Sequence, residues 1–220
     1  MTRTELARLL DHSVLKPEAT EREILAGAEI VRTWRIGFYC VQPCWVRLAA
    51  ELLAGANACL VTVAGFPHGC DRAEVKARAA AIAAAEGAGE IDMVLNFGAL
   101  RSGHATVVAA EIEAVVRAVQ TVPVKVILET AALTDSEKQL ACRLACDAGA
   151  AFVKTSTGFH PSGGATIADV RLLRAAVGPD RGVKASGGIR TLADALAMID
   201  AGANRIGTSA SAAILGALEI

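Results

Sequence analysis

The fold is decided by residues 147–154, Asp-Ala-Gly-Ala-Ala-Phe-Val-Lys, where an expected helix end passes through a glycine into a short apolar run. Glycine suits this place because the chain often needs a positive φ just past a helix. The same order of residues recurs at 52–63, 85–95 and 200–207. A helix, a break at glycine and a short buried strand therefore form the repeating unit of the chain.

Counting these units along the chain gives eight expected strands. They lie near 11–14, 38–41, 59–63, 91–95, 124–128, 152–154, 183–185 and 205–207, with a helix after each and a short helix before the first. Alternating strands and helices predict parallel crossovers, which both a closed barrel and an open doubly wound sheet satisfy. Eight evenly spaced units favour the barrel. We therefore expect an α/β fold, a single-domain (β/α)8 TIM barrel over residues 1–220 with a short N-terminal helix.

Composition narrows the class of protein. The chain has 220 residues, of which 53% are hydrophobic and only 4% aromatic, so small aliphatic side chains must fill the core of one domain. Its net charge is −1 without a long run of one sign, so we expect no nucleic acid and no membrane as partner. No segment has the pattern of a signal peptide or a transmembrane helix, and a cytoplasmic location is the default.

Motifs for metals and nucleotide cofactors are missing from the sequence. The six cysteines form no Cys-x-x-Cys pair, the four histidines are scattered, and we expect buried reduced thiols and no metal. The chain has neither a GxGxxG nor a Walker-type loop, so no nucleotide cofactor is indicated.

Charged residues stand in four of the expected strands, where apolar residues are the norm. They are Asp92, Lys125, Lys154 and Lys184. A barrel-end salt bridge explains any one of them, because a buried charge is costly unless it is paired. The two-residue period of a strand points Lys154 and Lys184 to the same interior, and a neighbouring cation with desolvation favours the neutral, nucleophilic amine of a lysine. The set together therefore indicates catalysis.

Glycines and hydroxyl groups follow the last three strands. Gly187 and Gly188 come after the seventh strand, Gly207 and Ser209 lie at the end of the eighth, and Gly158 follows the sixth. Free backbone N–H groups at these places are typical of a phosphate site, which barrels commonly hold after strands 7 and 8.

With these motifs the sequence resembles the deoxyribose-phosphate aldolase family. Lys154-Thr155-Ser156-Thr157-Gly158 and Val183-Lys184-Ala185-Ser186-Gly187-Gly188 are its most specific segments. The likeness runs from about residue 9 to residue 210 and also covers residues 11–16, 38–43, 90–94, 124–130 and 205–209.

The resemblance implies a class I aldolase that needs no cofactor and cleaves 2-deoxy-D-ribose 5-phosphate to acetaldehyde and D-glyceraldehyde 3-phosphate. Lys154 would form the Schiff base, and Asp92 and Lys184 would transfer protons. Lys125 and Asp11 would balance charge around them. The partners would be a small sugar phosphate and aldehydes.

The sequence leaves open the type of reaction and the roles of several residues. A non-covalent phosphate-binding barrel isomerase or synthase and a catalytically inactive sugar-phosphate-binding barrel are the alternatives. Some family members carry a tyrosine in a C-terminal tail that helps protonation, whereas the only tyrosine here is Tyr39. The sequence does not decide whether Cys40 reacts with aldehydes, whether His160 contacts phosphate, or whether the protein is a homodimer or a homotetramer.

Overall fold

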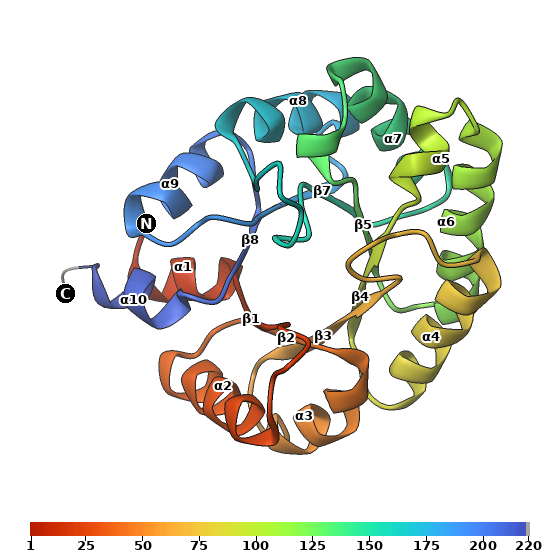
Figure 1. Cartoon of the computed structure of the whole chain (residues 1–220). Helices are drawn as coiled ribbons and strands as arrows, with labels where there is room; N and C mark the ends of the chain where they lie inside the picture. The colour runs from red at the N-terminus through yellow and green to blue at the C-terminus, as the bar shows by residue number, and fades with distance from the viewer. Residues whose placement is uncertain (219–220) are drawn as a thin grey trace.

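The chain folds into a closed parallel barrel in a computed structural model that describes residues 1–218. Within that range eight strands pair in chain order, and β8 pairs with β1. Figure 1 shows the strands at the centre of the molecule. The strands are β1 Leu10–Val14, β2 Phe38–Val41, β3 Cys59–Ala64, β4 Glu90–Val94, β5 Val124–Ile127, β6 Phe152–Lys154, β7 Gly182–Ser186 and β8 Arg205–Thr208. The predicted TIM barrel is confirmed, and each predicted strand end agrees within one residue. The expected domain, residues 1–220, ends two residues beyond the described part.

Helices surround the barrel on the outside (Figure 1). They are α1 Arg3–Leu9, α2 Glu21–Trp34, α3 Val46–Leu52, α4 Ala73–Ala85, α5 Phe97–Arg101, α6 Ala105–Val119, α7 Asp135–Asp147, α8 Ile167–Val177, α9 Leu192–Asp200 and α10 Ser211–Gly216, with 3-10 turns η1 Pro43–Trp45 and η2 Thr130–Ala132. Among residues 1–218, none of these helices is both long and apolar enough to cross a membrane.

Several helix starts follow the pattern of threonine with an acid three residues later. At Thr20 and Thr134 the backbone N–H donates to Glu23 and Glu137, respectively, and each pair forms a capping box. Such boxes satisfy N–H groups that a helix leaves without an internal partner. The capping patterns therefore place α2 and α7 after β1 and β5.

The two faces of the strands differ in chemistry. Val126, Val153 and Val183 point to the helices, and each is at most 1% exposed. Their neighbours Lys125, Lys154 and Lys184 are equally buried but belong to the barrel interior. The helix–sheet layer is therefore apolar, while the interior holds charged side chains beside an apolar group that includes Cys40, Val61 and Val63.

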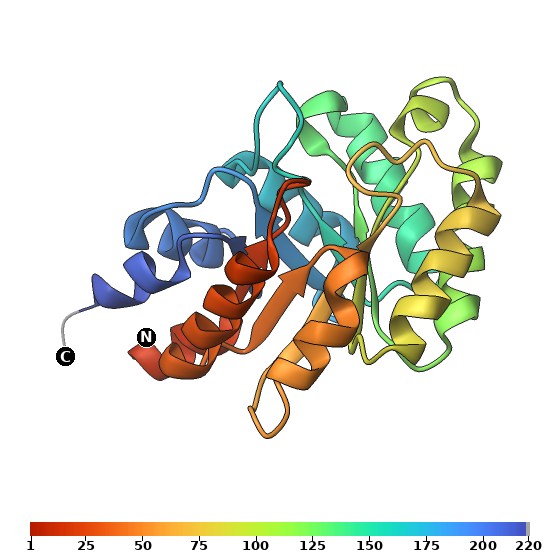
Figure 2. The same ribbon diagram turned by 60° about the horizontal axis from the view of Figure 1, so that its bottom comes forward.

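The loops after β3 and β6 lie on the same side of the barrel, as Figure 2 shows. This is the carboxyl end of the strands, where barrel enzymes hold their active sites. Four cysteines correct the expectation of buried thiols: Cys44 in η1 after β2 and Cys70 in the loop after β3 are exposed, and Cys59 and Cys146 are only partly buried. Neither of the two exposed cysteines lies on a barrel strand, whereas the buried Cys40 does.

Candidate active site

Four inward side chains meet at the carboxyl half of the barrel. Lys154 on β6 stands beside Lys184 on β7 in the strand register, and Asp92 on β4 stands beside Lys125 on β5. All four are at most 2% exposed. The catalytic residues expected from the sequence are therefore brought together.

Asp92 is the centre of this group. Its Oδ2 accepts hydrogen bonds from Nζ of Lys154 at 2.8 Å and of Lys184 at 2.7 Å, and its Oδ1 accepts from Nζ of Lys125 at 2.8 Å. Burial alone raises the pKa of Asp92, but the three ammonium groups hold that pKa well below its usual range. Asp92 is therefore a carboxylate at neutral pH.

Lys184 lies between two carboxylates, because it donates to Asp11 as well as to Asp92. Burial lowers the pKa of Lys184, but Asp11 and Asp92 raise it above its ordinary value. Asp11, which we expected to balance charge, thus contacts Lys184 directly. The second oxygen of Asp11 has no hydrogen-bond partner among the described residues.

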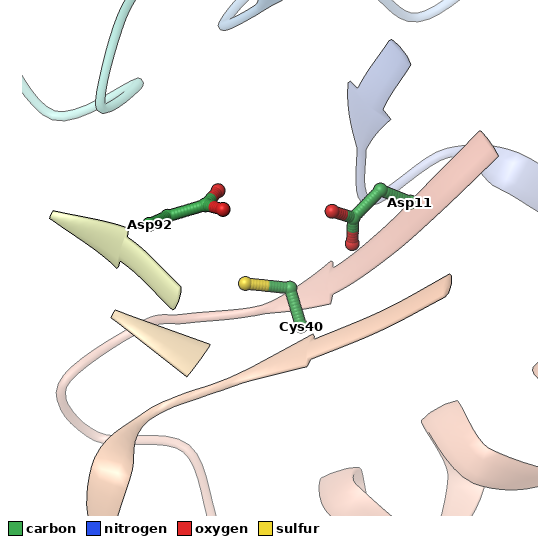
Figure 3. Close-up of side chains that lie close together, drawn as sticks. All are labelled: Asp11, Cys40 and Asp92. Atoms are coloured by element: carbon green, nitrogen blue, oxygen red, sulfur yellow. The ribbon is translucent and has the colours of Figure 1, made fainter. Parts of the chain in front are cut away.

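Cys40 completes a group of possible metal ligands with Asp11 and Asp92, whose ligand atoms lie within 4.8 Å of one another. Figure 3 shows the three side chains pointing toward a common space from β2, β1 and β4. The ammonium group of Lys184 bridges the two carboxylates, so the positive charge they call for is already supplied. Burial raises the pKa of Cys40 to about 12, whereas metals bind the thiolate. The donor set therefore suits an ion pair better than a metal.

A second layer of charges lies below Asp92. Lys125 also contacts Glu90 at 2.6 Å, and Glu90 accepts a hydrogen bond from Arg205 at 2.9 Å. The guanidinium of Arg205 packs over the ring of Phe38, 3.1 Å from its centroid. No role was predicted for Glu90 and Arg205, although the two-residue period places Glu90 on the face of Asp92.

These contacts form one interior charge network. It consists of Asp11, Glu90, Asp92, Lys125, Lys154, Lys184 and Arg205. Four cations against three carboxylates leave one excess positive charge. Lys184 and Lys125 each contact two carboxylates, whereas Lys154 contacts Asp92 alone. Lys154 is therefore the lysine of the network with the fewest anionic partners.

A cavity of about 560 Å³ opens above the network at the loop end of the barrel. Lys154 and Lys184 line its inner part. All five residues expected to hold phosphate also line it, namely Gly158, Gly187, Gly188, Gly207 and Ser209. The candidate nucleophile and the candidate anion site thus share one cavity.

Glycine is required where two of these loops approach each other. Gly187 has φ of +87°, and a Cβ atom there would lie 3.0 Å from Cα of Gly164 and 3.4 Å from Cα of Gly158. A larger residue would both strain the backbone and press the loops apart. The Gly-Gly pair after β7 therefore has a structural reason beyond an ordinary turn.

Three further residues line the cavity, and no site role was predicted for any of them. Lys16 and Arg190 add positive charge to it. His12 is buried, its Nδ1 lies 3.2 Å from Oγ of Ser211, and burial lowers its pKa to about 4. Their spacing in the sequence did not predict a place in the cavity, because they come from loops and from the outward face of β1.

His160 lies apart from the phosphate residues. Its ring and that of Phe97 pack edge to face, with centroids 5.9 Å apart, in a neighbouring pocket that shares Phe159 with the main cavity. Its Nδ1 accepts a hydrogen bond from the backbone N–H of Ser162. The structure therefore gives His160 a contact within its own loop.

Comparisons with known proteins agree with this geometry. Relatives named deoxyribose-phosphate aldolase from Enterococcus faecalis and Streptococcus sanguinis are both 52% identical to the chain, with 96% of each chain covered. A solved structure titled a putative deoxyribose-phosphate aldolase from Coccidioides immitis is 37% identical, with a TM-score of 0.95 over 98% of this chain and 86% of that one. A tetrameric deoxyribose phosphate aldolase from Aeropyrum pernix is 32% identical, with a TM-score of 0.91 over 98% and 91%.

The resemblance seen in the motifs is thus confirmed over nearly the whole chain. The sequence model of the family described as DeoC/LacD family aldolase matches residues 7–216, which include both lysines of the cavity and Asp92. By this match and by its closed barrel, the chain belongs to the DeoC/LacD family of aldolases.

Proposed function

We propose that this aldolase reversibly cleaves 2-deoxy-D-ribose 5-phosphate to acetaldehyde and D-glyceraldehyde 3-phosphate through a Schiff base on Lys154. The observation that carries the proposal is the position of Lys154, between the interior charge network and the cavity with the glycine loops. The relatives that cover nearly the whole chain are named for this substrate. The reaction belongs to the breakdown of deoxyribose phosphate.

Lys154 is the lysine best placed to act as nucleophile. Lys154 lines the cavity and has one carboxylate contact, whereas Lys184 has two. Its neutral amine attacks the open-chain aldehyde at C1 to give a carbinolamine. Loss of water then yields the iminium, which is a sink for electrons.

Asp92 and Lys184 handle the protons. When a base takes the proton of the C3 hydroxyl, the C3–C2 bond breaks, its electron pair moves into the iminium, and D-glyceraldehyde 3-phosphate leaves. Asp92 is the base, acting through a water molecule, because it is ionised and does not itself line the cavity. Lys184 returns a proton to C2 of the enamine, and hydrolysis then frees acetaldehyde and Lys154.

The phosphate group is held away from the reacting atoms. Backbone N–H groups of Gly187, Gly188 and Ser209 can point at an anion in the cavity, and Lys16 and Arg190 add charge. Contacts to this remote group orient the reacting end of the substrate.

The sequence is also compatible with two other functions. A non-covalent isomerase or synthase would use a lysine as a general acid and would form no adduct. A barrel that only binds sugar phosphate has no need of three lysines around Asp92, since buried charges are costly for folding. The network therefore favours the covalent aldolase.

Location and assembly are part of the proposal. A cytoplasmic location fits a phosphorylated substrate, because a charged sugar does not cross a bilayer unaided. The relative from Aeropyrum pernix is titled a tetramer. For this chain we propose a homodimer or a homotetramer, which sedimentation of the purified protein decides.

Borohydride trapping tests the mechanism. The protein is exposed briefly to acetaldehyde with sodium borohydride, and peptide mass spectrometry then locates the modification among the six lysines of the chain. We expect one ethyl group on Lys154 in the wild type and in Lys138→Met, whose lysine lies on an outer helix, and none at position 154 in Lys154→Met. Turnover of the sugar phosphate without an adduct would instead support the non-covalent enzyme.

A further inference from the structure

We propose that Glu129 is a positioning residue of this active site, which holds the cavity wall formed by residues 157–159. It acts through Thr157 and takes no part in the interior charge network. The inference about the wall comes from geometry alone, and only its kinetic consequence rests on the proposed function.

The backbone of Glu129 is strained. Its φ of +58° and ψ of +60° place it in the left-handed region, which is unfavourable for a residue other than glycine. Such a conformation persists where the surroundings hold it in place. Here the flanking residues are held, because the N–H of Leu128 donates to Lys154 and the N–H of Thr130 donates to Thr155, both at 2.9 Å.

The turn aims the side chain of Glu129 at the loop after β6. Its carboxylate accepts a hydrogen bond from Oγ1 of Thr157 at 2.5 Å and from the backbone N–H of the same residue at 3.2 and 3.4 Å. Glu129 is 1% exposed, and no ion pair with a cation holds it within the described residues 1–218. A buried carboxylate without a counter-charge is expensive for a fold, so a role in the site is the better explanation for it.

One residue thereby fixes a short segment of wall. The hydroxyl of Thr157 donates to Glu129 and accepts from the backbone N–H of Phe159 at 3.0 Å. Gly158 lies between them, and Thr157, Gly158 and Phe159 all line the cavity of Lys154. Loss of the carboxylate should therefore loosen the wall that faces the phosphate loops.

Lys154 itself is held independently of Glu129. The N–H of the next residue, Thr155, donates to the carbonyl of Lys184 at 3.0 Å, and its Oγ1 donates to the carbonyl of Ser186 at 3.2 Å. Strand pairing thus fixes the nucleophile, while Glu129 fixes the wall three residues later. Removal of Glu129 should impair the placement of a phosphorylated substrate much more than attack on a small aldehyde.

Hydrogen exchange tests the positioning directly. We compare wild type with Glu129→Gln, which keeps the size but not the charge, and with Asp169→Asn, which removes a buried carboxylate that pairs with Lys138 on the outer helices. We expect amides of residues 157–159 to exchange at least tenfold faster in Glu129→Gln and at the wild-type rate in Asp169→Asn. Unchanged exchange in Glu129→Gln overturns the proposal.

Kinetics test the consequence. For Glu129→Gln we expect KM for 2-deoxy-D-ribose 5-phosphate to rise about tenfold, while the rate of borohydride trapping of acetaldehyde on Lys154 stays within about twofold. Thr157→Val, which removes the hydroxyl that donates to Glu129, should also raise KM. KM of the double variant should be no higher than that of Glu129→Gln. An equal fall of trapping and turnover would show that Glu129 supports Lys154 and not the wall. A wild type that does not cleave the sugar phosphate refutes the proposed function, and the exchange comparison still decides the role of Glu129.

Discussion

Replacing Asp92 by asparagine turns the central carboxylate of the interior charge network into a neutral amide. Asp92 accepts hydrogen bonds from Lys125, Lys154 and Lys184 at 2.7–2.8 Å. An asparagine keeps one acceptor oxygen and turns a donor N–H₂ toward these ammonium groups. Asp92→Asn raises the excess positive charge of the network from one to two, because two carboxylates then face the same four cations.

The magnitude follows from burial. Removing one partner of a buried ion pair costs about 3–5 kcal/mol of unfolding free energy, and Asp92 is fully buried. As the proposed base, Asp92 should also contribute about 10²- to 10⁴-fold to turnover. We expect kcat for the sugar phosphate to fall by about 10³ with KM within a few fold, because Asp92 does not line the cavity.

The stability effect has a definite pH dependence. The pKa of Asp92 is held well below its usual range in the folded protein. Its contribution is therefore present above the unfolded pKa of about 3.9 and is lost as pH falls through the lower, folded pKa. Urea unfolding should show a constant difference between wild type and Asp92→Asn from pH 7 to 5, and a smaller difference below about pH 4.

A matched variant separates stability from chemistry. Glu111 is a buried carboxylate of the outer helices, 2.8 Å from Nζ of Lys76. Glu111→Gln should lose comparable stability but keep its kcat at a temperature where both variants are folded. If Asp92→Asn retained more than about a tenth of the wild-type kcat, the assignment of Asp92 as base would be wrong.

Three further outcomes are expected. Lys184→Met leaves Asp11 and Asp92 without their shared cation, and steady-state assays should show kcat lower by about 10² or more. Gly187→Ala strains a φ of +87° and presses on Gly164, so KM should rise about tenfold for the phosphorylated substrate and little for free 2-deoxyribose. His12, whose pKa burial lowers to about 4, adds stability that is present above pH 6.5 and lost as pH falls toward 4. Urea unfolding at pH 7 and 4.5 should show a loss of about 2.5 kcal/mol that is absent in His12→Gln.

Much of the fold could be predicted because its signals are local. A glycine after each of four helices and a two-residue period in the strands depend only on neighbours in sequence. The positions of Asp92, Lys154 and Lys184 followed from the same period, since the carboxyl ends of parallel strands share one end of a barrel. In the structure Lys154 and Lys184 both donate hydrogen bonds to Asp92.

Partner choice within the network was not predictable in this way. Glu90 and Asp92 alternate on one face of β4, but Glu90 contacts Lys125 and Arg205, 35 and 115 residues away along the chain. Which cation contacts which carboxylate depends on how the barrel closes and how its strands are staggered. The two-residue period of a strand gives no information on either. The single carboxylate contact that distinguishes Lys154 from the other two lysines therefore appeared only with the three-dimensional pairing.

The position of the Glu129 side chain was also not predictable from the two-residue period. In sequence it continues the inward period of Lys125 and Ile127, which would place it on the interior face beside the network. Its left-handed backbone ends that period and turns the carboxylate to Thr157 instead. No residue preference announces such a turn at glutamate, because glycine and asparagine are its usual occupants. The costly conformation is tolerated because it separates two tasks: strand pairing holds Lys154, and Glu129 holds the wall past which the phosphorylated end must fit.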